Sequence, residues 1–167
     1  MVNCILISIV SIAACMDLIR EKIDNRFLAV CWVLAAGYQA GSAGFKGIGI
    51  FLTGSIIPIM MLYVLFRFRM LGAGDIKLLS VIGGIVGPTA IFKCIVLSFL
   101  FGALLSLGFV LVCGNLTARL LYFANYINHV ITVKKALPYY RPGKRMENIH
   151  FTIPILMAVL IHIGGFY

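Results

Sequence analysis

The amino-acid sequence predicts an all-α membrane protein, a bundle of six transmembrane helices. Of its 167 residues, 62% are hydrophobic and 11% are charged, whereas a soluble domain carries about 25% charged residues. The apolar residues form continuous runs, which is typical of membrane helices of about 17–25 residues and not of the alternating strands of a β-barrel. We expect residues 1–167 to form a single membrane-embedded domain.

Six apolar segments make up the predicted bundle. Most of them are long enough, or nearly so, to cross the hydrocarbon core of a bilayer. The fourth is short and rich in glycine, and it contains Pro88 near its end. The predicted segments are residues 2–18, 27–42, 47–66, 75–91, 95–113 and 151–166.

The basic residues predict how the bundle is oriented. Twelve of the 14 lysines and arginines lie in residues 18–26, 67–77 and 114–150, and the other side holds only Lys46 and Lys93. Cytoplasmic loops of membrane proteins carry such an excess. We therefore expect a multi-pass protein of the plasma membrane with both termini outside the cytoplasm. The net charge of +9 then reports orientation, and no nucleic-acid partner is expected because no aromatic–basic module accompanies it.

The segment 114–150 is the one long stretch between predicted spans. Its apolar residues recur at helical spacing from Leu116 to Ile131, which predicts a cytoplasmic amphipathic helix before the last span, or a continuation of the fifth span. Basic residues at such a surface attract anionic membrane lipids. The pattern fits either a substrate-docking surface or a membrane-anchored connector.

Two of the five acidic residues are candidates for a functional site. Asp17 ends the first predicted span and Asp75 begins the fourth, so we expect both at the cytoplasmic membrane surface. Ionisable residues at membrane depth are functional candidates by default. Two carboxylates that lie close together share a proton, so one can act as general base on water while the other donates a proton. This chemistry hydrolyses peptide bonds without a metal, and the three histidines are expected to be isolated from one another: His129, His150 and His162.

The stretch "MLGAGDIKLL" surrounds Asp75 with residues that suit this task. Gly72 and Gly74 leave room for a sharp turn or for a substrate strand, and a helix start favours an ionised carboxylate. Lys77 is expected to reach the lipid headgroups or to bias the pair. The same pattern also fits an ordinary helix cap, a common Gly-x-Gly turn or a carboxylate in an ion pathway.

The letters "GAGDIKLL" resemble the Gly-x-Gly-Asp signature of the type IV prepilin peptidases, which are membrane aspartyl proteases. In that family a first aspartate ends a helix and is followed by a basic loop that closes in an Ile-Pro-Asn-like triplet. Here "DLIREKIDNRF" supplies Asp17, the basic loop and residues 23–25, with Asp24 in place of the proline. The last segment, "HFTIPILMAVL", is similar to the family's closing helix, with Pro154 in place.

The resemblance implies that Asp17 and Asp75 are the catalytic pair and that Gly72, Gly74 and Lys77 belong to the motif loop beside the substrate. It implies no cofactor and no metal. The implied substrates are prepilins or pseudopilins of a type IV pilus or protein-secretion system of the tight-adherence (Flp) kind. They would be cut at the cytoplasmic face, between a short basic leader and an apolar helix. Many relatives carry a Cys-x-x-Cys segment that methylates the new N-terminus, and because this sequence has none, we expect no N-methylation.

Two other functions stay open at this point. A small ion- or proton-coupled transporter would use Asp17 and Asp75 as ion-binding carboxylates, although the sequence shows no internal repeat of the kind that builds many transporters. A structural assembly subunit would tolerate the loss of both carboxylates.

Overall fold

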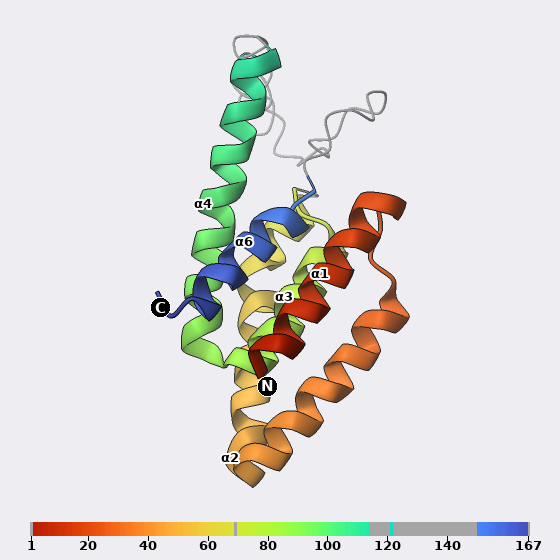
Figure 1. Cartoon of the computed structure of the whole chain (residues 1–167), viewed down its shortest axis with the longest axis vertical. Helices are drawn as coiled ribbons and strands as arrows, with labels where there is room; N and C mark the ends of the chain where they lie inside the picture. Colours follow the sequence, from red (N-terminus) through yellow and green to blue (C-terminus); the bar gives the residue numbers. More distant parts are fainter. Residues whose placement is uncertain (1, 69, 114–120, 122–149, 167) are drawn as a thin grey trace.

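The computed structural model describes residues 2–68, 70–113, 121 and 150–166 (Figure 1). Within these residues the named elements are all helices: α1 (Val2–Arg20), α2 (Asn25–Arg67), α3 (Ala73–Val86), α4 (Pro88–Cys113) and α6 (Thr152–Ile163). The predicted all-α class is therefore confirmed. The predicted amphipathic segment before the last helix lies outside the described residues, apart from Leu121 and His150.

Three of the described helices, α1, α2 and α4, are long and apolar enough to cross a membrane. Their outer surfaces carry large apolar side chains, such as Val33 and Met60 on α2, which are 72% and 73% exposed. Apolar helices with an apolar exterior are characteristic of membrane proteins, because lipid tails cover that exterior. The predicted count of six spans is not confirmed, since α3 and α6 are short helices.

The long helix α2 joins the second and third predicted segments. Gly44, with φ of 57° and ψ of −132°, leaves the helical conformation, and the chain turns back on itself so that α2 has two arms (Figure 1). Residues with a side chain rarely adopt such a backbone conformation, whereas glycine does so readily. Asp24 precedes the first arm and caps it, because its Oδ1 accepts a hydrogen bond of 3.0 Å from the backbone N–H of Arg26.

The central helix α3 ends earlier than the sequence predicted. Gly87 has φ of 86°, and Pro88 has no N–H with which to continue the helix. The predicted boundary between the fourth and fifth segments is therefore wrong, and α4 begins at Pro88. Gln39 of α2 supplies a donor where the N–H of residue 88 is missing. Its Nε2 donates to the carbonyl oxygens of Gly84 and Ile85 at 3.2 and 2.9 Å.

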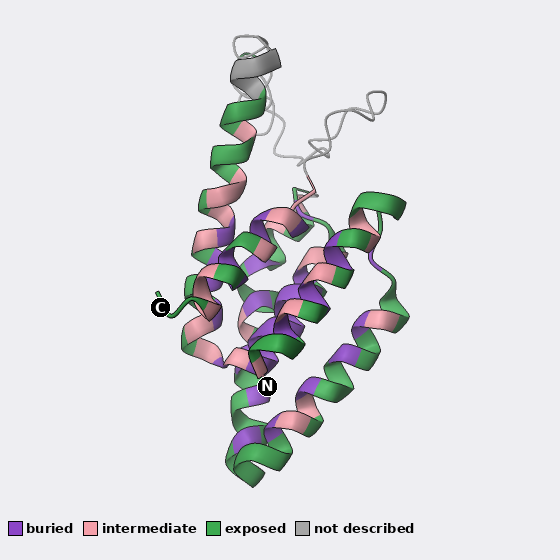
Figure 2. Ribbon diagram, in the orientation of Figure 1, coloured by how far each residue is buried: buried purple, intermediate pink, exposed green. Residues whose placement is uncertain are grey.

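Packing places α3 against α1, α2 and α4, while α6 packs against α1 and α4. Figure 2 shows buried residues concentrated on the inner faces of these helices, and residues 78–85 of α3 are all buried. Gly54 and Gly83 let α2 and α3 approach so closely that a Cβ on either would lie 2.1 Å from the carbonyl oxygen of the other. Because α3 begins at the Gly-x-Gly-Asp stretch, this packing also determines where Asp75 lies.

Candidate active site

A cavity of about 380 Å³ lies at the end of the bundle where α1 ends and where α3 and α6 begin. All five residues singled out from the sequence line it, namely Asp17, Gly72, Gly74, Asp75 and Lys77. The structure thus brings together positions that are far apart in the chain. The other lining residues are Glu21, Lys22, Ile23, Asn25, Ala73, His150 and Phe151.

Asp75 lies in the first turn of α3, and Gly72 is the N-cap residue of that helix. The carboxylate of Asp75 accepts a backbone hydrogen bond from Gly72, as the third residue of a helix does in a capping box. A Cβ on Gly72 would lie 3.1 Å from Oδ2 of Asp75, which is tighter than an ordinary contact. The glycine therefore leaves room for the carboxylate, and Asp75 supports the helix start without being the cap residue itself.

The pKa of Asp75 is raised from its ordinary value of 3.8 to about 7. Burial is the largest cause, because it disfavours the charged form, and the charge of Asp17 is the second. The hydrogen bond from Gly72 and the charge of His150 act in the opposite direction. Asp75 lies in the first turn of α3, which is not one of the three candidate spans. The charge of Asp17 is thus close enough to influence the ionisation of Asp75.

Asp17 lies near the end of α1, and its side chain is 15% exposed. Its Oδ2 accepts a hydrogen bond of 2.8 Å from Oγ1 of Thr152, and Nδ1 of His150 lies 3.1 Å from the same oxygen. Neither of these two contacts of Asp17 was predicted from the sequence. The overlooked signal is that both residues stand at the start of the last predicted span, on the membrane face expected for Asp17 and Asp75.

The loop between α1 and α2 forms one wall of the cavity. Ile23 of this loop is buried, and a Cβ on Gly74 would meet it at 3.4 Å, an ordinary contact distance. Lys77 Nζ donates a hydrogen bond of 2.9 Å to Oδ1 of Asn25. Lys77 therefore links α3 to the start of α2 and holds this wall beside Asp75.

The model of the type IV leader peptidase family matches residues 4–107 of the chain. The chain belongs to this family. The predicted resemblance is thereby confirmed, and family membership makes the protein a peptidase of the type IV leader peptidase kind. Comparison with curated proteins and with solved structures gave no significant match. The matched region includes Asp17 and Asp75, whereas α6, which contacts Asp17, lies beyond it.

Proposed function

We propose that the protein is an aspartic-type prepilin leader peptidase with Asp17 and Asp75 as its catalytic pair. The observation that carries this proposal is that both carboxyl groups line one cavity, where the charge of Asp17 helps to raise the pKa of Asp75. Membership of a peptidase family supports hydrolysis of a peptide bond as the reaction. The two carboxyl groups in the cavity are the residues that we propose to carry it out.

A pair of this kind holds one proton between its two members near neutral pH. The ionised carboxylate removes a proton from a water molecule, whose oxygen attacks the carbonyl carbon of the peptide bond. The protonated carboxyl group hydrogen-bonds to the carbonyl oxygen, and a proton then passes to the leaving amine as the C–N bond breaks. The cavity beside Gly72 offers room for this water and for the backbone of an extended substrate.

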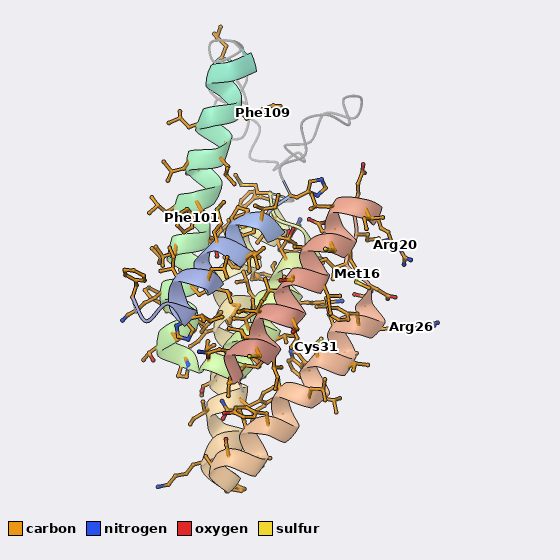
Figure 3. All side chains as sticks on the ribbon, in the orientation of Figure 1. Met16, Arg20, Arg26, Cys31, Phe101 and Phe109 are labelled. Atoms are coloured by element: carbon orange, nitrogen blue, oxygen red, sulfur yellow. The ribbon has the colours of Figure 1, made fainter. Side chains whose placement is uncertain are left out.

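The proposed substrate is a prepilin or pseudopilin of the tight-adherence (Flp) kind, cut between its short basic leader and its apolar helix. The family supports this substrate class, whereas the charge of the cavity does not select it, because Lys22 and Lys77 line the cavity together with the acids. We further propose that the cavity faces the cytoplasm, with both termini on the other side of the plasma membrane. Arg20 and Arg26 support this orientation, because basic residues favour the cytoplasmic face. Their side chains project away from the bundle (Figure 3), and each adjoins in the chain a residue that lines the cavity, Glu21 and Asn25.

Co-expression of the chain with a prepilin precursor from the same genome tests the proposal, with mass spectrometry to detect the shortened product. We expect Asp17→Asn and Asp75→Asn each to abolish processing. Asp24→Asn is the matched control, because it makes the same chemical change at an aspartate that caps α2, and asparagine caps helices equally well. Processing at the wild-type rate in either variant of the pair would contradict the proposal. Proton-coupled flux in liposomes without cleavage would favour a transporter instead.

A further inference from the structure

The first residue of α6, Thr152, and His150, which precedes the N-cap of this helix, supply two side chains that reach the same oxygen of Asp17. Thr152 Oγ1 donates to Oδ2 at 2.8 Å, and His150 Nδ1 lies 3.1 Å from it. Thr152 is fully buried, whereas the side chain of His150 is 25% exposed. Because an ionised carboxylate only accepts hydrogen bonds, both groups serve as donors when Asp17 is charged.

We propose that His150 and Thr152 are positioning residues that hold Asp17 as the ionised, water-activating member of the pair, with Asp75 as the protonated member. This inference rests on the proposed function, because it divides the roles within the same pair. It also extends the site to α6, which lies beyond the residues 4–107 that the family model matches.

The surroundings of Asp75 complement those of Asp17. Asp75 accepts a hydrogen bond from the backbone of Gly72, and burial is the main reason that its pKa rises to about 7. A carboxyl group that retains its proton near neutral pH suits the donor role, while a carboxylate that receives two hydrogen bonds suits the charged role. Carboxyl groups in unlike surroundings divide acid and base functions in this way.

Packing on neighbouring helices holds the start of α6 in place. Phe151 lies between the two donors in the chain, and its ring packs against Phe99 of α4 with centroids 5.1 Å apart. The backbone N–H of Ile153 donates to the carbonyl oxygen of His150 at 3.2 Å. α6 also packs directly against α1, which carries Asp17. A group that positions another must itself be fixed, and these contacts meet that requirement.

The test uses the full chain, purified in detergent, with a prepilin precursor from the same genome as substrate. Thr152→Val removes the hydroxyl at nearly constant volume, and His150→Leu removes the ring donor. We expect each to lower kcat by about tenfold to a hundredfold, the range for a lost hydrogen bond to a charged group, with KM changed less than about twofold. Thr152→Ser and His150→Asn restore a donor at the same place and should recover most of kcat. His162→Gln, near the other end of α6, should keep the wild-type kcat.

The outcomes separate this inference from the proposed function. Wild-type kcat in both Thr152→Val and His150→Leu, with Asp17→Asn inactive, would overturn the inference and leave the proposed function intact. Processing by Asp17→Asn and Asp75→Asn would instead remove the proposed function. Equal losses in the valine and serine variants would show that residue 152 acts through packing alone and would overturn its assigned role. If Thr152→Val does not fold, the comparison of His150→Leu with His150→Asn decides.

Discussion

Gly83 of α3 and Gly54 of α2 bring two helix backbones into contact, so we expect Gly83→Ala to push the helices apart. The new Cβ would lie 2.1 Å from the Gly54 carbonyl oxygen, whereas ordinary contact begins at 3.4 Å. Relieving the clash requires a shift of about 1.3 Å, and overpacking of this kind costs about 1–3 kcal/mol. The same shift would lengthen the 2.9 Å hydrogen bond from Gln39 to Ile85. We therefore expect the free energy of unfolding to fall by about 2–4 kcal/mol.

Thermal unfolding in detergent, followed by tryptophan fluorescence, measures this loss. Trp32 is the one tryptophan of the chain. Its ring packs against Phe51 with centroids 5.2 Å apart, and its Nε1 donates to Ser80 Oγ at 3.3 Å, so its emission reports on the contact between α2 and α3. For a protein of this size the expected loss lowers Tm by about 4–16 °C.

Gly41→Ala provides the matched control for this experiment. Gly41 lies on α2 as Gly54 does, but a Cβ there would meet nothing within 4 Å. Because alanine favours the helix over glycine, we expect Gly41→Ala to leave stability unchanged or to raise it by up to about 1 kcal/mol. A Tm for Gly83→Ala that matches the control would refute the argument from close backbone packing.

Two further predictions concern Asp75 and Gln39. The folded state raises the pKa of Asp75 from 3.8 to about 7 and so binds this proton more tightly than the unfolded chain does. Ionisation of Asp75 therefore lowers the free energy of unfolding progressively as pH rises from about 4 to 7, by at most about 4 kcal/mol in total. Above pH 7 this loss does not grow further. In thermal unfolding measured against pH, Asp75→Asn should match the wild type near pH 4 and exceed its Tm most above pH 7; a difference independent of pH would contradict the raised pKa. Gln39→Leu leaves the carbonyl oxygens of Gly84 and Ile85 without their donor. The free energy of unfolding should therefore fall by about 2–5 kcal/mol. An unchanged Tm would contradict this expectation and show that another group replaces the amide.

The helical class was predictable because it depends on composition and on long apolar runs, which are local properties of the chain. The turn within α2 was also predictable as a break, since Gly44 falls between two predicted segments. The end of α3 was not predicted correctly, because apolar residues continue on both sides of Gly87 and Pro88 and hydropathy alone does not mark the break. At this break, the side chain of Gln39, from a distant part of the chain, donates hydrogen bonds to the carbonyl oxygens of Gly84 and Ile85.

For the candidate site, the motif and the basic loops predicted Asp17 and Asp75 at one membrane face, and in the structure both residues line one cavity. That reasoning uses only the expected depth of each residue in the membrane, and residues at the same depth need not contact one another. The same depth was available for His150, yet nothing in the sequence paired it with Asp17. The hydrogen-bond role of Gly72 was likewise hidden, because it depends on the third residue of α3 turning back to the helix start.

The sequence by itself determined that this chain is an apolar helical protein with two acids and a Gly-x-Gly-Asp stretch at a charged end of its helices. These conclusions follow from residue types and short spacings, whose effects reach about one helical turn. Only the tertiary structure decided that the start of α6 contacts Asp17, across 133 residues of chain. The physical reason is that such a contact depends on how α6 packs against α1 and α4, and helix packing joins residues according to their position in space.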